Sequence, residues 1–152
     1  MEIKMFHLEN DRDTAKVRFI PYPGGFVYAK LRVHYPKGDP MHPIRCTGDT
    51  CEYCKTHSNP PLRYKYFFAL YDEDAKCIKF WERWPLGTEQ LCDTLNNYKD
   101  IEHQVFAITR FGDKGNLATR YALTPLYKSA TPELDPSELP SVTELFDFKY
   151  KF

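Results

Sequence analysis

Three of the five cysteines in this 152-residue chain lie within nine residues, as Cys46, Cys51 and Cys54 in the stretch RCTGDTCEYCK. Cys51 and Cys54 form a C-x2-C pair, a spacing that lets two thiolates converge on one cation. Zinc has no ligand-field preference and takes soft sulfur together with imidazole, so three cysteines and one histidine close a tetrahedral shell. The cluster therefore predicts one structural zinc ion.

Three histidines are near enough in the sequence to supply the fourth ligand. His34 ends a predicted strand on its polar face, where a loop folding back from Cys46 can meet it. His42 is nearer to the cysteines but has a proline on either side within two residues, and His57 needs a tight return of the chain. We expect His34 to be the ligand, with His42 and His57 as the alternatives.

Other uses of the cysteines fit less well. A redox C-x2-C pair usually accompanies a βαβ unit, and no such pattern surrounds this one. Disulfides are disfavoured because five is an odd number of cysteines and the N-terminal residues lack an apolar signal core. Cys77 and Cys92 fall in a predicted strand and a predicted helix, so we expect them to be buried thiols.

An enzyme interpretation rests on His7 and Glu9, which with the C-x2-C pair formally match the H-x-E…C-x-x-C signature of zinc nucleobase deaminases. That signature requires proline before the first cysteine of the pair, and Thr50 stands there. A closed zinc shell also leaves no coordination position for a reacting water. We therefore expect no catalysis.

The elements that must position the cluster are predicted to be mainly strands. Residues 36–61 are rich in proline, glycine and cysteine and offer little to build a core, so this loop needs the zinc as a staple. A five-stranded barrel of the OB-fold type with one or two short helices fits this pattern, and a β-sandwich is the alternative. The expected strands are 14–20, 26–35, 63–71, 76–84, 103–111 and 117–125, with a helix over 88–98 that Thr88 caps.

Several of these strands alternate between an apolar face and a face of basic and aromatic residues. In 76–84, for example, Ile78 and Phe80 are expected to face inward, and Lys79, Trp81 and Arg83 outward. Cations that contact phosphates and aromatic rings that stack on bases are what single-stranded nucleic acid binding requires. The residues predicted to contact nucleic acid are Lys16, Arg18, Tyr28, Lys30, Arg32, Lys79, Trp81 and Arg83, joined by Arg63, Lys65, Arg110 and Arg120. The leading core candidates are Phe19, Phe80 and Phe106.

Composition and charge narrow the class of protein. Hydrophobic residues make up 42% of the chain, enough for a buried core, and no apolar run is long enough to span a membrane. The formal net charge is zero, but residues 129–148 hold five acidic residues and no Lys or Arg, which leaves 21 basic and 16 acidic residues elsewhere. This segregation predicts a basic body over residues 1–128 that binds a polyanion. The acidic segment over 129–152 would compete with that polyanion for the basic body.

These pieces resemble a known family. The strands VRFIP and GFVYAKLRVHY, the loop RCTGDTCEYC, the segment YFFALYDEDAKCIKFWE and the hairpin ITRFGDKGNLATRYALTP look like the zinc-containing single-stranded-DNA-binding proteins of tailed bacteriophages. The resemblance runs from about Val17 to Pro125. The chain departs from the best-known members at its N-terminus, which lacks a basic arm, and in its short C-terminal segment.

The resemblance implies an OB-fold that holds one zinc ion through His34, Cys46, Cys51 and Cys54. It also implies sequence-nonspecific binding and protection of single-stranded DNA during phage replication, recombination and repair. Replication or recombination proteins would then bind the acidic C-terminal segment, in the reducing cytoplasm of a host cell. A zinc-stabilised RNA-binding or protein-interaction module is the alternative.

Overall fold

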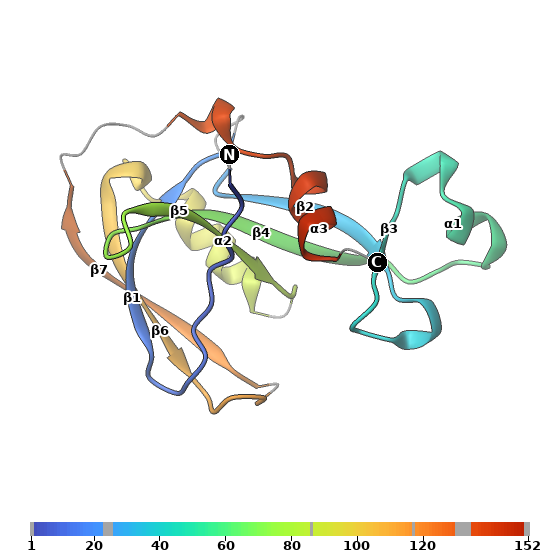
Figure 1. Cartoon of the computed structure of the whole chain (residues 1–152), viewed down its shortest axis with the longest axis horizontal. Helices are drawn as coiled ribbons and strands as arrows, with labels where there is room; N and C mark the ends of the chain where they lie inside the picture. Colours follow the sequence, from blue (N-terminus) through green and yellow to red (C-terminus); the bar gives the residue numbers. More distant parts are fainter. Residues whose placement is uncertain (1, 23–25, 86, 117, 130–134, 151–152) are drawn as a thin grey trace.

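The computed structural model describes residues 2–22, 26–85, 87–116, 118–129 and 135–150 (Figure 1). Within these ranges the chain forms one antiparallel sheet of seven strands and three short α-helices. The strands are β1 (Thr14–Ile20), β2 (Tyr28–His34), β3 (Ile44–Arg45), β4 (Arg63–Asp72), β5 (Cys77–Arg83), β6 (Gln104–Phe111) and β7 (Arg120–Lys128). The helices are α1 (Glu52–Thr56), α2 (Thr88–Asn96) and α3 (Val142–Lys149), with the 3-10 turns η1 (Pro36–Gly38), η2 (Gly48–Thr50), η3 (Ile101–His103) and η4 (Pro136–Glu138).

The long strand β4 organises the sheet. β2 pairs with its residues 63–68 and β1 with its residues 69–72 along one edge, while β5 pairs with residues 66–72 along the other. The strands other than β5 follow the order β3-β2-β4-β1-β6-β7, and the outer strands β3 and β7 do not pair with each other. The mainly β prediction is confirmed. The described strands form an open sheet of seven strands and not a closed barrel, so the predicted five-stranded barrel of the OB-fold type is not confirmed.

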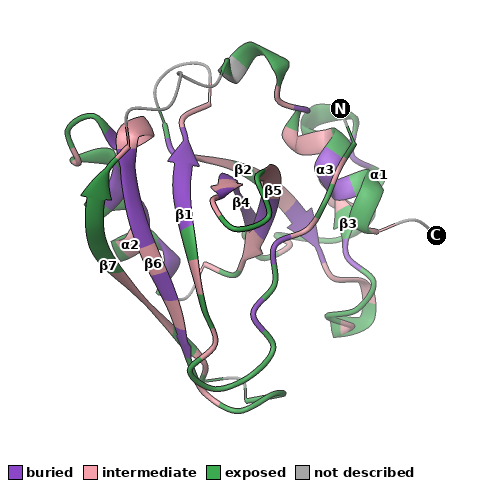
Figure 2. Cartoon of the chain, turned by 60° about the vertical axis from the view of Figure 1, so that its left-hand side comes forward, coloured by how far each residue is buried: buried purple, intermediate pink, exposed green. Residues whose placement is uncertain are grey.

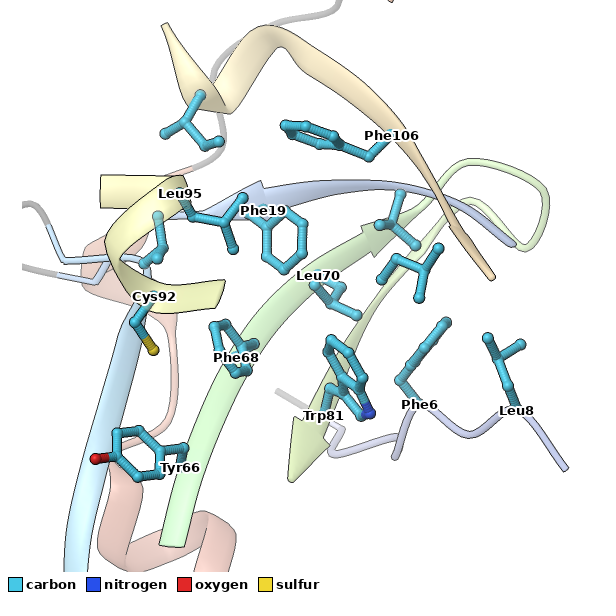
Figure 3. Close-up of a cluster of buried hydrophobic side chains, with 14 residues drawn as sticks. Phe6, Leu8, Phe19, Tyr66, Phe68, Leu70, Trp81, Cys92, Leu95 and Phe106 are labelled. Atoms are coloured by element: carbon cyan, nitrogen blue, oxygen red, sulfur yellow. The ribbon is translucent and has the colours of Figure 1, made fainter. Parts of the chain in front are cut away.

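One apolar cluster lies on the face of the sheet that the N-terminal segment and α2 cover (Figure 3). Phe6 and Leu8 reach it from the N-terminal segment, which runs beside β5 through backbone hydrogen bonds to Phe80, and Cys92 and Leu95 reach it from α2. The expected core residues Phe19 and Phe106 are buried here, as the sequence predicted. The remaining buried members of this cluster are Val17, Val27, Tyr66, Phe68, Leu70, Trp81, Ile101 and Ile108.

A second cluster lies on the opposite face and includes the C-terminal helix α3. Leu145 and Phe146 of α3 pack with Phe67 of β4 and with Phe80 of β5, the third expected core residue. Ser141 caps α3 in a capping box, since its hydroxyl accepts from the Glu144 backbone N–H and the Glu144 carboxylate accepts from the Ser141 N–H. Burial is therefore found on both faces of the central strands, whereas much of the outer strand β7 is exposed (Figure 2).

The C-terminal segment thus contributes a helix to the core, although its composition predicted an acidic segment. Residues 130–134 and 151–152 of that segment lie outside the described residues. No helix in the described ranges is long and apolar enough to cross a bilayer.

The expected strands are found at their predicted places within one to three residues at each end. The expected helix over 88–98 is α2, but its N-cap is Gly87, and Thr88 is a buried first residue without a capping hydrogen bond. Gly87 has φ of 75°, a left-handed conformation that glycine adopts without strain, so the chain turns into the helix one residue before the predicted cap.

Candidate metal centre and nucleic-acid interface

The short hairpin of β2 and β3 brings the first two candidate metal ligands together. Val33 pairs with Arg45 and His34 with Ile44, and the backbone N–H of Cys46 donates to the carbonyl of Arg32 at 3.0 Å. This pairing fixes Cys46 next to the end of β2, where His34 lies. The cysteine loop, which we define as residues 36–61, extends from this end of the sheet (Figure 1).

A tight turn and one helical turn bring the other two ligands back to the same place. Gly48 in η2 has φ of 70°, which reverses the chain where a residue with a side chain would be strained. Cys51 is then the N-cap of α1, and its carbonyl accepts from the Lys55 N–H at 3.1 Å. Because residues three apart share one side of a helical turn, Cys51 and Cys54 present their sulfurs together.

The four donor atoms converge closely enough to hold one metal ion. The donor atoms of His34, Cys46, Cys51 and Cys54 all lie within 4.8 Å of one another. The His34 Nε2 atom is 3.5 Å from the Cys51 sulfur and 3.4 Å from the Cys54 sulfur, and the sulfurs of Cys46 and Cys54 are 3.7 Å apart. The predicted convergence of these four side chains is therefore confirmed.

The two alternative histidines do not join this group. The His42 ring is exposed, and its Nδ1 atom lies 2.6 Å from a carboxylate oxygen of Asp39. The His57 ring stacks on Tyr53, with its Nδ1 atom 3.0 Å from the Tyr53 carbonyl. His7 and Glu9, on which the deaminase interpretation rested, are exposed near the N-terminus and are not part of the group.

The thiols of the C-x2-C pair have unequal pKa values. Hydrogen bonding from the Cys54 backbone N–H is the largest influence on Cys51 and lowers the pKa of its thiol to about 6. Burial, followed by the neighbouring thiols, raises the pKa of Cys54 to about 11. Both thiols must be deprotonated when a cation binds them, so metal binding at this pair releases protons.

Tyr53, between the two cysteines of the pair, packs against a metal ligand. Its ring stacks on the His34 ring at a centroid distance of 4.5 Å and an interplanar angle of 22°. Its other neighbour is the His57 ring, at 3.9 Å and 10°. This stack of three rings fixes the orientation of the His34 imidazole from the side of α1.

Basic and aromatic side chains gather on one face of β2, β4 and β5. The register places Lys30 opposite Tyr66, which is itself opposite Arg83, and Arg32 opposite Tyr64. Residues opposite each other in an antiparallel pair point to the same side. We call this surface the basic–aromatic face; it consists of Tyr28, Lys30, Arg32, Tyr64 and Arg83, while Tyr66 between them is buried in the first apolar cluster.

Two of the three cations of this face lie over aromatic rings. The Lys30 ammonium lies 4.8 Å from the centre of the Tyr64 ring, and the Arg83 guanidinium lies 4.5 Å from that of Tyr121. Arg32 Nε is buried without a hydrogen-bond partner. In the part of the chain that the structure describes, no carboxylate forms an ion pair with Lys30, Arg32 or Arg83, although Glu82 is near enough to Arg83 to stabilise its charge.

The positive part of this face is the part nearest the cysteine loop. At the other end, burial and then Cys92 and the acidic side chains of α2, Asp93 and Glu89, raise the pKa of Tyr28. Burial raises the pKa of Tyr66 too, with Glu89 as the next largest cause. An anionic ligand is therefore disfavoured beside the acidic side chains of α2.

Four other cations predicted to contact nucleic acid have structural partners instead. Arg18 is buried and paired with Glu73, and Lys65, only 1% exposed, is paired with Glu82 at 3.1 Å. Lys79 pairs with Asp72 at 2.8 Å. Arg110 is buried and donates to the backbone carbonyls of Leu8, Gly112 and Asp113, which ties the N-terminal segment to the β6–β7 turn.

The prediction that Trp81 faces outward is wrong. Trp81 is 3% exposed and lies in the first apolar cluster, edge-on to Phe6 at a centroid distance of 5.8 Å (Figure 3). The alternation within β5 is present, but the N-terminal segment covers the face that was expected to be solvent-exposed. Lys16 and Arg120 are exposed on β1 and β7, which do not pair with β2 or β5.

Two aromatic residues that the sequence did not single out lie beside the metal centre. Trp84 was the last residue of the predicted strand 76–84 but lies just beyond the end of β5, and it is 44% exposed. Tyr53 was not predicted to be part of the site, because only the cysteines on either side of it form a recognisable motif. Signals for both were present, since Trp84 precedes a proline at a strand end and Tyr53 is the aromatic residue within C-x2-C.

Comparison of the chain with models of known protein families, with curated proteins and with solved structures found no match. The class of protein is thus defined by its own features: a mainly β chain with one three-cysteine, one-histidine site that can hold a metal ion, beside a basic–aromatic sheet face.

Proposed function

We propose that this chain is a non-catalytic, sequence-nonspecific single-stranded-DNA-binding protein with one structural zinc ion. The observation that carries the proposal is the basic–aromatic face, where Lys30, Arg32 and Arg83 lie among tyrosines without recorded ion-pair partners in the described residues. Single-strand binding combines a positive path for the phosphates with rings on which bases stack.

Zinc is the metal that the donor set and distances favour. Bond lengths of about 2.3 Å to sulfur and about 2.0–2.1 Å to nitrogen give a tetrahedron with edges of about 3.8 Å between sulfurs and about 3.5 Å between sulfur and nitrogen. The distances between the Cys46 and Cys54 sulfurs, 3.7 Å, and from His34 Nε2 to the two sulfurs, 3.4 and 3.5 Å, match these edges. Four protein ligands leave no open position, which supports a structural ion and a non-catalytic protein.

The biological setting is proposed from the resemblance stated above. In it the protein coats and protects single-stranded DNA during phage replication, recombination and repair, within the reducing cytoplasm of a host. Its acidic C-terminal segment would contact replication or recombination proteins through the exposed acidic residues that flank and line α3, such as Asp135 and Glu144.

The test is fluorescence titration of the purified protein with oligo-dT at two salt concentrations, with the metal content measured on the same sample. We expect one zinc per chain and binding that weakens with salt, because neutralised phosphates release counterions. Lys30→Gln is expected to weaken binding and to reduce the salt slope by about 0.7, the value for one phosphate contact in single strands. The matched control is Lys114→Gln, in the exposed β6–β7 loop, which should change neither quantity.

Two outcomes would contradict the proposal. Equal affinity for a duplex and for oligo-dT at the same salt would point to a general polyanion binder. Tighter binding of a single-stranded RNA oligomer of matched sequence would favour the RNA-binding alternative, because OB-folds and other stacking surfaces serve both nucleic acids.

A further inference from the structure

A groove of about 440 Å³ lies between the cysteine loop and the ends of β2, β4 and β5. Small-molecule sites usually measure about 300–1,000 Å³, so the groove has room for one small planar ligand rather than for a length of polymer. Its principal lining residues are His34, Tyr35, Tyr53, Arg63, Tyr64 and Trp84.

Trp84 is held in place although it is 44% exposed. The Lys65 ammonium lies 3.6 Å from the centre of the Trp84 ring, and the Tyr35 ring stacks on it at 6.2 Å and 23°. Lys65 is itself fixed by Glu82, at 3.1 Å. A cation–π contact and a ring stack therefore orient Trp84 before any ligand arrives, which lowers the entropy cost of stacking a ligand on it.

Another part of the groove lining belongs to the candidate metal centre. Tyr53 lies between the ligands Cys51 and Cys54 and stacks on the ligand His34 at 4.5 Å. Tyr64, from the start of β4, also lines the groove and is a member of the basic–aromatic face. The groove is thus bounded by rings from the sheet and from the cysteine loop.

The charge at the groove selects the kind of planar ligand. Arg63 is exposed at the rim, and no ion pair is recorded for it in the described ranges. Arg32 lies opposite Tyr64 on β2, so the groove is continuous with the positive end of the basic–aromatic face. No described carboxylate lines the groove. Exposed cations beside aromatic walls complement a flat base that carries a phosphate.

We propose that this groove binds one unpaired nucleobase, stacked on Trp84 between the sheet and the cysteine loop, with the adjoining phosphate on Arg63. The inference rests on the proposed function, since it assigns a specific base-binding subsite to the single strand that crosses the basic–aromatic face. It makes Trp84, not Trp81, the tryptophan that meets the nucleic acid.

The experiment uses the full chain with Trp81→Phe, which leaves Trp84 as the only tryptophan. Its fluorescence is followed during titration with oligo-dT and, separately, with an abasic oligomer of equal length at the same salt. The two oligomers share their phosphates and differ only in bases. We expect oligo-dT to quench Trp84 and the abasic oligomer to leave it nearly unchanged.

The affinity of single-residue variants for oligo-dT is then measured by a method that does not use tryptophan fluorescence, such as fluorescence anisotropy of labelled oligo-dT. Trp84→Leu is expected to weaken oligo-dT binding about 5- to 150-fold, the loss of one stacked base. The matched control Tyr127→Leu removes an aromatic residue exposed on β7, outside the groove, and should leave the affinity unchanged. Arg63→Gln should weaken both oligomers, because it removes a phosphate contact.

The assignment of the groove as a base-binding site and the proposed function can be contradicted independently. Oligo-dT binding with no quenching of Trp84, or equal quenching by the abasic oligomer, would overturn the groove assignment and leave single-strand binding intact. Absence of oligo-dT binding by the unaltered protein would overturn both. The metal content and thermal midpoint of each variant show whether that variant is folded. The quenching measurement remains valid even if Trp84→Leu is unstable, because it is made on a protein that retains Trp84 and the groove.

Discussion

Single ligand residues are expected to control both the metal and the fold of the cysteine loop. The loop contributes Cys51 and few other buried apolar residues to the core, so its order depends on the bonds that its sulfurs make. Cys51→Ser is expected to abolish stoichiometric metal binding and to lower the thermal midpoint, because the free energy of binding a structural metal is also folding free energy. Elemental analysis and thermal unfolding of the same sample measure both.

Cys77→Ser is the matched control for that substitution, since Cys77 is half-buried in β5 and lies outside the four-residue group. It should keep one metal per chain. A Cys51→Ser protein without metal and with unchanged stability would refute the structural role of the site.

Some functional residues could be predicted from the sequence, and others could not. The metal ligands were predictable, because C-x2-C spacing and a histidine at a strand end constrain chemistry directly. Arg18, Lys65 and Trp81 were misplaced, because alternation shows which residues share a face but not whether that face is covered. Glu82 illustrates the difficulty: it accepts from Lys65 and from the Tyr150 hydroxyl, and this pairing across elements makes burial of a lysine tolerable.

At the scale of the element, Asp72 fixes the β4–β5 hairpin. Its Oδ1 accepts from the backbone N–H groups of Asp74 and Ala75, both at 3.0 Å, and its Oδ2 accepts from Lys79 at 2.8 Å. Burial alone would raise the pKa of Asp72, but the hydrogen bonds from Lys79 and from the turn outweigh it and lower the pKa below its usual value. The ionised form is thus the one that stabilises the native hairpin.

Asp72→Asn is therefore expected to cost about 1.5–3 kcal/mol of unfolding free energy at neutral pH, the range for hydrogen bonds to a charged group. Because the native pKa lies below the unfolded one, this contribution is complete above about pH 4 and is lost as the pH falls through the native value. The difference in stability between the unaltered protein and the variant should shrink accordingly in urea titrations over that range. Asp74→Asn, at an exposed position of the same turn, is the control and should show neither effect.

The elements themselves were largely visible in the sequence, while their assembly was not. β1, β2 and β4 lie where alternation and aromatic runs predicted them. The open sheet was not predictable, because periodicity cannot say that β1 and β2 share one edge of β4 or that the outer strands β3 and β7 do not pair with each other. α3 was overlooked because acidic composition outweighed a local signal, the capping box of Ser141 and Glu144.

At the scale of the whole molecule, the sheet has a core on each face, and the C-terminal helix provides part of the second. Asp147 of α3 pairs with Arg45 at 3.1 Å, and Lys149 with Glu82 at 3.4 Å, so two ion pairs in the last turn of the helix accompany its apolar contacts. The helix therefore lies against the hairpin that carries the cysteine loop and against β5, which leads to Trp84. We expect loss of α3 to destabilise the candidate metal centre as well as the core.

Leu145→Ala tests this dependence. Leu145 is fully buried in the second cluster, so the substitution is expected to lower the free energy of unfolding by about 2–5 kcal/mol, as is usual for a buried leucine. The control Leu126→Ala removes the same atoms from a side chain that is 41% exposed on β7, and should cost about 0.5 kcal/mol or less. Urea unfolding measures both. Equal stability of the two variants would mean that residues 142–149 contribute little to folding. A much lower unfolding free energy for Leu145→Ala than for Leu126→Ala would mean that the fold of the basic body depends on packing with its acidic C-terminal segment.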